Sequence, residues 1–214
     1  MKKLSIAMMV LAVAAVACTD APNADQAATA EKQEAAAATG ASFAIDTTNS
    51  VVEWLGTKPI GQHNGIMKIA NGIFSVENGT ITAGNFTIDV NTLTDLDLTT
   101  ETGKEKLEGH LKSPDFFDVA KFPTAKFEIT SVEPISNDSL ATHKISGNLT
   151  LKDSTKNVSF PAKLTIAENA VKAEANFNID RTQWGLHYGN DKSLGDKFIR
   201  PEVNIKLNIS ANKS

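Results

Sequence analysis

The sequence predicts an all-β protein made of antiparallel strands, and three observations support this prediction. From Ser42 onwards, apolar and polar residues alternate with a period of two through many short segments. Turns that contain Asn or Gly separate several of these segments at hairpin spacing. Only one stretch, residues 100–112, is rich in helix formers instead. Because each alternating strand has one apolar face, the strands must bury those faces together, as a barrel or as a sandwich.

The alternation defines the expected strands in chain order. Successive side chains of a strand point to opposite faces, so each segment has one dry face and one wet face. The clearest segments are 52–54, 86–90, 145–151, 162–166, 171–179 and 203–209, and weaker ones are 66–69, 73–76 and 126–132. Hairpin turns are expected at Asn71-Gly72, at 77–79 and at 167–170, because Asn and Gly tolerate the positive φ that tight hairpins need.

Residues 100–112 depart from the alternation and predict a short helix on a crossing between strands. Leu107, His110 and Leu111 recur at helical spacing and therefore share a face. Ser113-Pro114 is expected to end the helix, because the residue before a proline is disfavoured in the helical conformation. We interpret the following segment, residues 115–118, as a turn that places two phenylalanines over one end of the strands.

The chain begins with a segment that is typical of an export signal. Lys2 and Lys3 precede an apolar run over residues 4–17, which is shorter than the ~20 residues that a membrane-spanning helix needs. The letters A-V-A-C at 15–18 resemble the cleavage box of bacterial lipoproteins. We therefore expect residues 1–17 to be removed and Cys18 to be acylated, with chains such as palmitate, anchoring the protein to an envelope membrane on the periplasmic side. The alternative is an ordinary secretory signal that leaves Cys18 as a free thiol.

The segment after the signal has a composition of its own. Residues 18–41 contain no aromatic and no large aliphatic side chain, so they bury too little surface to offset the entropy of ordering. We predict a flexible tether over 18–41 and one folded domain over 42–214. Without residues 1–17 the net charge changes from −4 to −6, because two lysines and no acids are lost. This charge argues against a nucleic-acid partner, while a homodimer stays open.

Several motifs occur in a fixed order along the domain. The most specific runs from Leu111 to Asp118 (L-K-S-P-D-F-F-D) and continues from Phe122 to Phe127 (F-P-T-A-K-F). A strand with the letters G-N-L-T-L follows at residues 147–151. In order and spacing these motifs resemble the YceI-like family of lipocalin-like polyisoprenoid-binding proteins. The resemblance implies an extended eight-stranded antiparallel barrel with one short helix, and an apolar tunnel that holds a polyisoprenoid or a similar long-chain lipid.

The resemblance also implies a binding protein rather than an enzyme, with no cofactor besides the bound lipid. The candidates for lining the tunnel are Trp54, Phe86, Ile88, Leu111, Phe116, Phe117, Phe127, Leu149, Phe177 and Trp184. His63 and Arg181 are candidates for contacting a lipid head group, although Arg181 could equally form an ion pair with Asp180. The four histidines have no metal-ligand spacing, so we expect no metal site.

The alternation is equally compatible with a barrel whose interior is filled by side chains. A filled interior would favour a different function, in which rim loops of a solid barrel bind another protein and protect the cell under stress. The lipid-binding function, by contrast, requires an internal cavity lined by apolar side chains.

Overall fold

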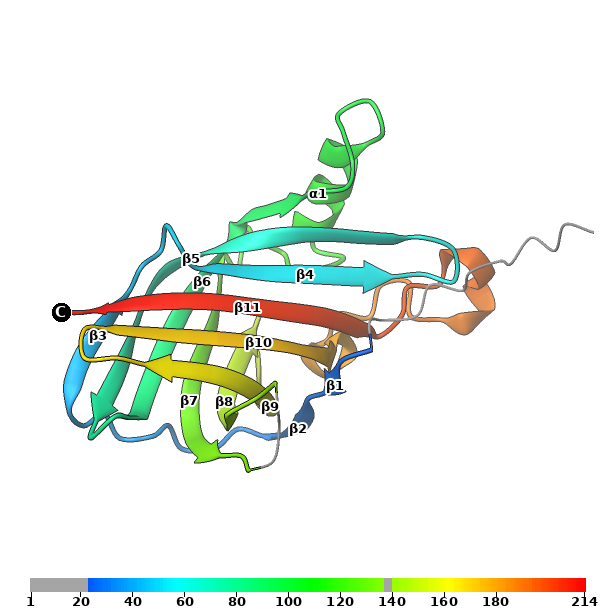
Figure 1. Cartoon of the computed structure of the whole chain (residues 1–214). Helices are drawn as coiled ribbons and strands as arrows, with labels where there is room; N and C mark the ends of the chain where they lie inside the picture. Colours follow the sequence, from blue (N-terminus) through cyan, green and yellow to red (C-terminus); the bar gives the residue numbers. More distant parts are fainter. Residues whose placement is uncertain (1–22, 137–139) are drawn as a thin grey trace, which may run out of the picture.

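The structure is a computed structural model that describes residues 23–136 and 140–214 (Figure 1). The predicted signal peptide and Cys18 lie outside the described residues. Eight antiparallel strands pair in sequence, and the last of them pairs with the first, so the predicted barrel is confirmed. These strands are β4 (Val51–Thr57), β5 (Gln62–Glu77), β6 (Thr80–Asp95), β7 (Thr124–Pro134), β8 (His143–Leu151), β9 (Ser154–Ile166), β10 (Ala170–Asp180) and β11 (Glu202–Lys213).

A short strand, β3 (Ala41–Ile45), extends the position of β4 toward the opposite end of the barrel. Both strands lie between β5 and β11, and a corner at residues 46–50 separates them. The Asp46 carboxylate stabilises this corner, because it accepts hydrogen bonds from the backbone N–H groups of Thr48 and Asn49 at 3.0 and 3.1 Å.

The turns of the barrel follow the sequence prediction at two places and depart from it at a third. The hairpin at 77–79 forms between β5 and β6, with positive φ at both Asn78 and Gly79, and the 167–170 turn joins β9 to β10. The predicted hairpin at Asn71-Gly72 is wrong. These residues lie inside β5, where a register shift next to them bends the strand. Because β5 pairs with neighbours along both edges, the ladder outweighs the local turn preference.

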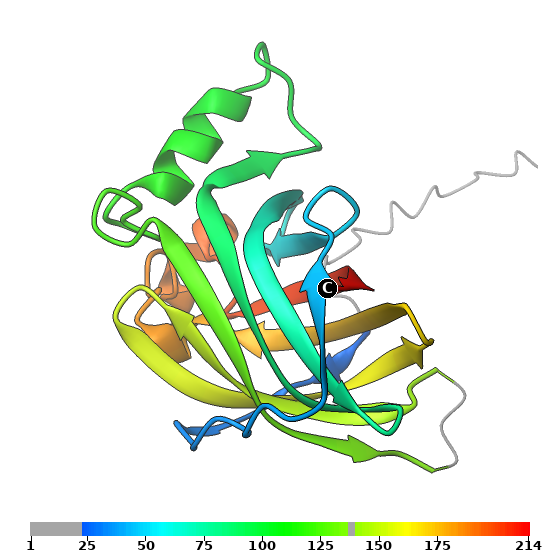
Figure 2. The same cartoon turned by 90° about the vertical axis from the view of Figure 1, so that its left-hand side faces the viewer.

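The predicted helix is α1 (Lys104–Lys112), and it begins only after Gly103, which has a φ of 103°. Two short 3₁₀ helices, η1 (Arg181–Trp184) and η2 (Lys192–Lys197), lie in the connection from β10 to β11. Figures 1 and 2 show that α1 lies beside the end of β6, outside the barrel wall. We call this end of the barrel the mouth; it carries α1, the 113–123 connection and the 185–200 loop. In residues 23–136 and 140–214, no helix is long and apolar enough to cross a bilayer.

The expected tether is wrong for residues 23–41, which run along the barrel wall as a strap. Within the strap, β1 (Asp25–Gln26) pairs with β10 and β2 (Ala28–Glu31) pairs with β9. The direct β9–β10 ladder covers only residues 162–166 and 171–175. Outside this ladder β9 and β10 are not paired with each other. There the strap pairs with residues 156–159 of β9 and with residues 177–178 of β10.

Two kinds of contact hold the strap. Ala27 is 4% exposed, belongs to the apolar core and donates its N–H to the Asn178 carbonyl at 2.8 Å. Further along, the Asn148 side-chain amide bonds both the N–H and the carbonyl of Gln33, at 3.0 and 2.7 Å. Composition alone missed this because the strap is ordered by backbone pairing with open strand edges, which needs no large side chain.

Candidate functional site

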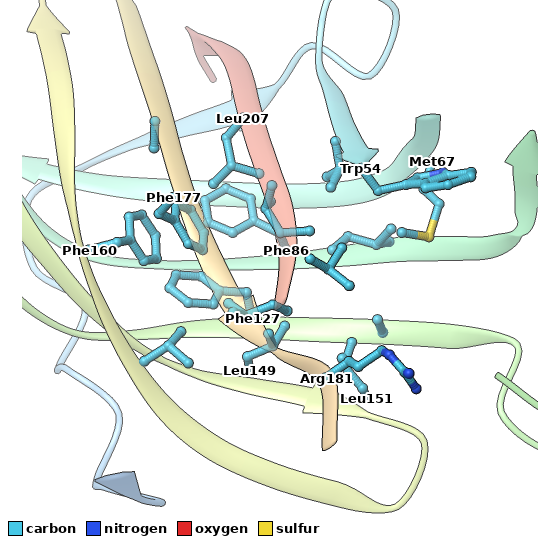
Figure 3. A pocket seen from close by; sticks show the side chains of 18 of the residues that line it. Trp54, Met67, Phe86, Phe127, Leu149, Leu151, Phe160, Phe177, Arg181 and Leu207 are labelled. Atoms are coloured by element: carbon cyan, nitrogen blue, oxygen red, sulfur yellow. The ribbon is translucent and has the colours of Figure 1, made fainter. Parts of the chain in front are cut away.

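An apolar cavity of about 210 Å³ lies inside the barrel (Figure 3). Every barrel strand contributes to its lining, and Arg181 supplies the only charged side chain among the lining residues. Nine of the ten predicted lining residues border this cavity: Trp54, Phe86, Ile88, Leu111, Phe116, Phe117, Phe127, Leu149 and Phe177. The alternation placed the six that lie in strands, because one face of each strand must point into the barrel, whereas Leu111 lies in α1 and Phe116 and Phe117 lie in the 113–123 connection.

Phenylalanine rings form a row across the cavity. Phe160 and Phe177 stack with their ring centroids 3.9 Å apart, and Phe127 lies 5.9 Å from Phe160. Phe86 lies 6.2 Å from Phe127, and Phe74 ends the row at 5.0 Å from Phe86. Side-chain contacts of this kind bring β5, β6, β7, β9 and β10 together through dispersion and burial rather than directional bonds.

Gly147 makes room for one ring of this row. A Cβ atom built at Gly147 would lie 2.2 Å from the Phe127 ring, which is closer than any real contact. The glycine of the G-N-L-T-L motif therefore allows the far edge of the Phe127 ring to approach the β8 backbone closely. A side chain here would push the ring toward the centre of the cavity.

Trp184 is the one predicted lining residue that does not border the cavity. It lies in η1 beyond the end of β10, and it is almost completely buried. Its indole N–H donates to the Leu149 carbonyl at 2.9 Å. The side chain therefore connects η1 to β8. This agrees with the position of Trp184, which lies after the last alternating residue of β10.

Arg181 organises the 185–200 loop. It is buried, and its guanidinium donates to the carbonyls of Leu186, Tyr188 and Ile199, while its Nε donates to the Arg200 carbonyl. Burial lowers the pKa of Arg181, and the nearby carboxylates oppose that shift. Neither role considered for Arg181 describes this arrangement. Its bonds go to the backbone of the loop, and the Asp180 carboxylate instead accepts from the Thr182 N–H and hydroxyl at 2.9 and 2.6 Å.

Trp54 carries a polar group that has no partner in the structure. Its ring lines the cavity, while its indole N–H is buried and makes no hydrogen bond. A buried donor without a partner costs about 1–3 kcal/mol. An acceptor that reached this N–H would remove that cost.

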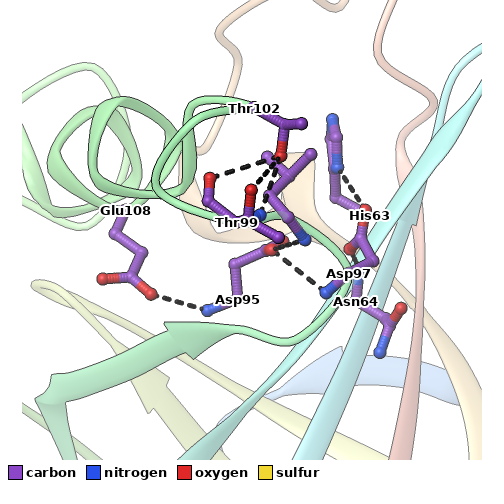
Figure 4. Close-up of polar contacts among 8 residues, drawn as sticks. His63, Asn64, Asp95, Asp97, Thr99, Thr102 and Glu108 are labelled. Carbon is purple, nitrogen blue, oxygen red and sulfur yellow. Dashed lines mark hydrogen bonds and ion pairs between the residues drawn. The ribbon is translucent and has the colours of Figure 1, made fainter.

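A polar cluster lies on the mouth side of Trp54. His63 Nδ1 is 2.9 Å from Asp97 Oδ2, and a carboxylate oxygen of Asp95 lies within 4.8 Å of both residues' ligand atoms. Figure 4 shows how the end of β6 and the following loop bring the two aspartates toward His63 on β5. The Glu108 carboxylate of α1 accepts from the Asp95 N–H at 2.9 Å and thereby attaches the helix to the same place.

The two carboxyl groups of the cluster differ in their environments. Burial raises the pKa of Asp95, whose side chain is completely buried. Burial would also raise the pKa of Asp97, but hydrogen bonds from the Asn64 N–H and His63, together with the neighbouring carboxyl group of Asp95, lower it on balance. The sequence analysis missed this cluster and placed His63 near a head group. The spacing of Asp95 and Asp97, two residues apart at the end of a strand, is the feature of the sequence that could have indicated the cluster.

Aromatic and aliphatic side chains surround the mouth. His110 lies edge-on to Phe116 and Tyr188, with ring centroids 5.1 and 4.6 Å apart, so α1 contacts the 185–200 loop. The turn predicted over 115–118 forms, with Phe116 buried and Phe117 half-buried. Several large apolar side chains of this rim are exposed to solvent: Ile60, Leu96, Tyr188 and Leu194.

Comparison with known proteins points to one family. A family model described as the YceI-like domain matches residues 43–211. A relative named Protein YceI, from Salmonella arizonae, is 44% identical over 66 residues, which span 31% of this chain and 32% of that protein. The same identity and coverage apply to Protein YceI from Salmonella newport. The chain thus matches about a third of the length of these curated relatives.

Solved structures share the fold at low sequence identity. Burkholderia cenocepacia BcnA superposes with a TM-score of 0.63 at 19% identity, covering 78% of this chain and 99% of BcnA. A polyisoprenoid binding domain from Saccharophagus degradans gives a TM-score of 0.60 at 14% identity, covering 82% of this chain and all of that domain. The Campylobacter jejuni YCEI protein gives 0.51 at 19% identity, covering 74% of this chain and 84% of that one.

Proposed function

Because this chain belongs to the YceI-like family, we propose that it binds a polyisoprenoid or a similar long-chain lipid inside its barrel, without catalysing a reaction. The observation that carries the proposal is the internal cavity, whose lining is apolar apart from Arg181. The relationship to a polyisoprenoid binding domain of the same fold agrees with this proposal.

The physical basis of binding would be removal of the hydrocarbon chain from water. Burial of one methylene contributes about 0.8 kcal/mol, whereas association costs about 4–15 kcal/mol in lost freedom. A chain of two to four isoprene units therefore suffices for useful affinity. A cavity of about 210 Å³ favours such a short segment, and a longer chain would require the phenylalanine row to rearrange.

The orientation of the lipid follows from the polar atoms near the mouth. The buried Trp54 N–H lacks an acceptor, while the guanidinium of Arg181 is occupied by loop carbonyls. We therefore assign Trp54, rather than Arg181 or His63, as the contact for an oxygen atom at the polar end of the lipid. The hydrocarbon would extend inward toward Phe160 and Phe177.

The proposed setting is the bacterial envelope, with the protein acylated at Cys18 and facing the periplasm. Two acyl chains give firm membrane attachment, whereas one gives only marginal binding. Since the strap follows Cys18 closely in sequence and is attached to the barrel wall, the anchor would hold the barrel close to the membrane. The protein could then sequester or transfer lipid over a short distance.

Native mass spectrometry of the full chain, extracted in mild detergent, tests the proposal. We expect a co-purified apolar molecule, and saturable uptake of geranylgeraniol once that molecule is removed. Ala175→Leu fills part of the cavity from β10 and should reduce uptake at least tenfold. Ala44→Leu is the matched control, because Ala44 is exposed on β3. Repeated absence of any bound lipid, together with equal uptake by both variants, would contradict the proposal.

A second candidate function is a stress-protective protein whose rim loops bind another protein. The exposed side chains of Ile60, Leu96, Tyr188 and Leu194 at the mouth favour it, because exposed apolar side chains gathered in one place often mark interaction surfaces. This candidate predicts no uptake of geranylgeraniol at any concentration, and loss of a specific partner when Leu96 and Leu194 are both replaced by Asp.

A further inference from the structure

The polar cluster at the mouth has the composition of a metal site. It combines one imidazole nitrogen with two carboxylates, a ligand set that suits Zn²⁺ and other divalent transition metals. The three ligand atoms lie within 4.8 Å of one another. In a tetrahedral zinc site they would be about 3.4 Å apart, as follows from bond lengths near 2.1 Å. His63 Nδ1 and Asp97 Oδ2, which are 2.9 Å apart, would have to separate by about 0.5 Å, and the Asp95 oxygen would have to move closer by about 1.4 Å at most.

Asp95 is a second, independent observation that points to a ligand at this position. The residue is completely buried, and its Oδ2 has no hydrogen-bond partner. Its other oxygen accepts from the N–H groups of Asp97 and Leu98 at 3.1 and 2.7 Å, so the carboxylate is held in one orientation. A buried carboxylate oxygen that is both fixed and unpartnered calls for a ligand at that position.

Asp97 is arranged in the same manner. Its Oδ1 accepts from the Asn64 N–H at 2.8 Å, which leaves Oδ2 directed at His63. In metal sites, ligating carboxylates are held by hydrogen bonds of this kind. Asp97 thus uses one oxygen for the backbone and the other for His63, as Figure 4 shows, and a carboxylate oxygen of Asp95 lies within 4.8 Å of the ligand atoms of both residues.

We propose that His63, Asp95 and Asp97 form a binding site for one divalent transition-metal ion, with Zn²⁺ preferred. The ion would take His63 Nδ1 and one oxygen from each aspartate, with water completing its coordination. It would connect β5 to the loop that leads into α1, and Glu108 would connect the helix itself through the Asp95 N–H. The mouth would thereby be held in one arrangement.

Zinc titration of the lipid-free full chain tests this site separately from lipid binding. All samples carry Cys18→Ser, so that this thiol contributes no ligand. Calorimetry should give one Zn²⁺ per chain, and saturating Zn²⁺ should raise Tm by about 5 °C or more. Mg²⁺ should bind at least a hundredfold more weakly, because imidazole is a poor ligand for it.

Variants show whether the cluster is the site. His63→Gln and Asp97→Asn should each weaken Zn²⁺ binding at least tenfold and abolish the rise in Tm. His143→Gln is the control, since His143 lies at the start of β8, away from the mouth. If either His63→Gln or Asp97→Asn does not fold, the other variant and the wild-type titration still show whether the cluster binds Zn²⁺. No saturable Zn²⁺ binding by the wild type, or equal loss in His143→Gln, would overturn the proposal.

Discussion

The interior of the barrel and its mouth are held together by different forces. Inside, phenylalanine, leucine and isoleucine side chains meet through apolar contact, without any fixed direction. At the mouth, irregular backbone is held by directional bonds, from Arg181 to the 185–200 loop and from Glu108 to the end of β6. Apolar contact tolerates changes of shape, whereas directional bonds specify one arrangement. The difference predicts that the interior can adapt to ligands of different shape, while the mouth keeps one geometry.

The largest effect on stability is expected when the hydrogen bonds of Arg181 to the 185–200 loop are removed. Arg181→Lys keeps the charge but cannot reach four carbonyls, because an ammonium lacks the planar fork of a guanidinium. At least two charge-assisted bonds of about 1.5 kcal/mol each would be lost, so the free energy of unfolding should fall by about 3 kcal/mol. Urea denaturation measures this.

Lys197→Ala is the control for Arg181→Lys, because Lys197 is an exposed cation of the same loop. Equal stability of Arg181→Lys and the wild type would show that the loop does not depend on the buried guanidinium. The mouth would then depend less on directional bonds, and differ less from the interior.

A smaller effect is expected at the seam between β9 and β10, where the interior relies on the strap. Ala27→Asp places a charge in the apolar core and should detach residues 23–31, at a cost of about 2 kcal/mol in unfolding free energy. Amide hydrogen exchange should then accelerate at residues 156–159 and 177–178, which the strap covers.

Ala28→Asp provides the matched control for the seam, since Ala28 is the exposed neighbour of Ala27. This variant should retain both the stability and the exchange protection of the wild type. If the two variants behave alike, the strap does not close the barrel wall.

The smallest effect is expected at Trp54, where the interior meets the mouth. Trp54→Phe keeps an aromatic ring and removes the unpartnered N–H. Geranylgeraniol, which ends in a hydroxyl, should bind about five- to tenfold more weakly, equivalent to about 1 kcal/mol. The matching hydrocarbon without oxygen should bind within twofold of its wild-type affinity. Equal losses for both ligands would mean that Trp54 contributes only apolar contact.

The predicted and observed structures differ most where distant segments meet. Period-two alternation located the apolar face of each strand, and with it the six predicted lining residues that lie in strands, because consecutive residues of a strand point to opposite faces. Helical spacing located Leu111, and the predicted turn located Phe116 and Phe117. The hairpin predicted at Asn71-Gly72 and the tether predicted for 23–41 were wrong because partners far away in sequence decided both. Trp184 was misplaced for a related reason, since it lies beyond the alternating segment.

The amino-acid sequence by itself determined most of the barrel strands, the short helix and the family to which the chain belongs, because these depend on local periodicity and on motifs in a fixed order. Only the tertiary structure decided the use of Arg181, the course of the strap and the meeting of His63 with Asp95 and Asp97. These three depend on which strand ends come together when the barrel closes. Closure is a property of the whole chain, and no short segment encodes it.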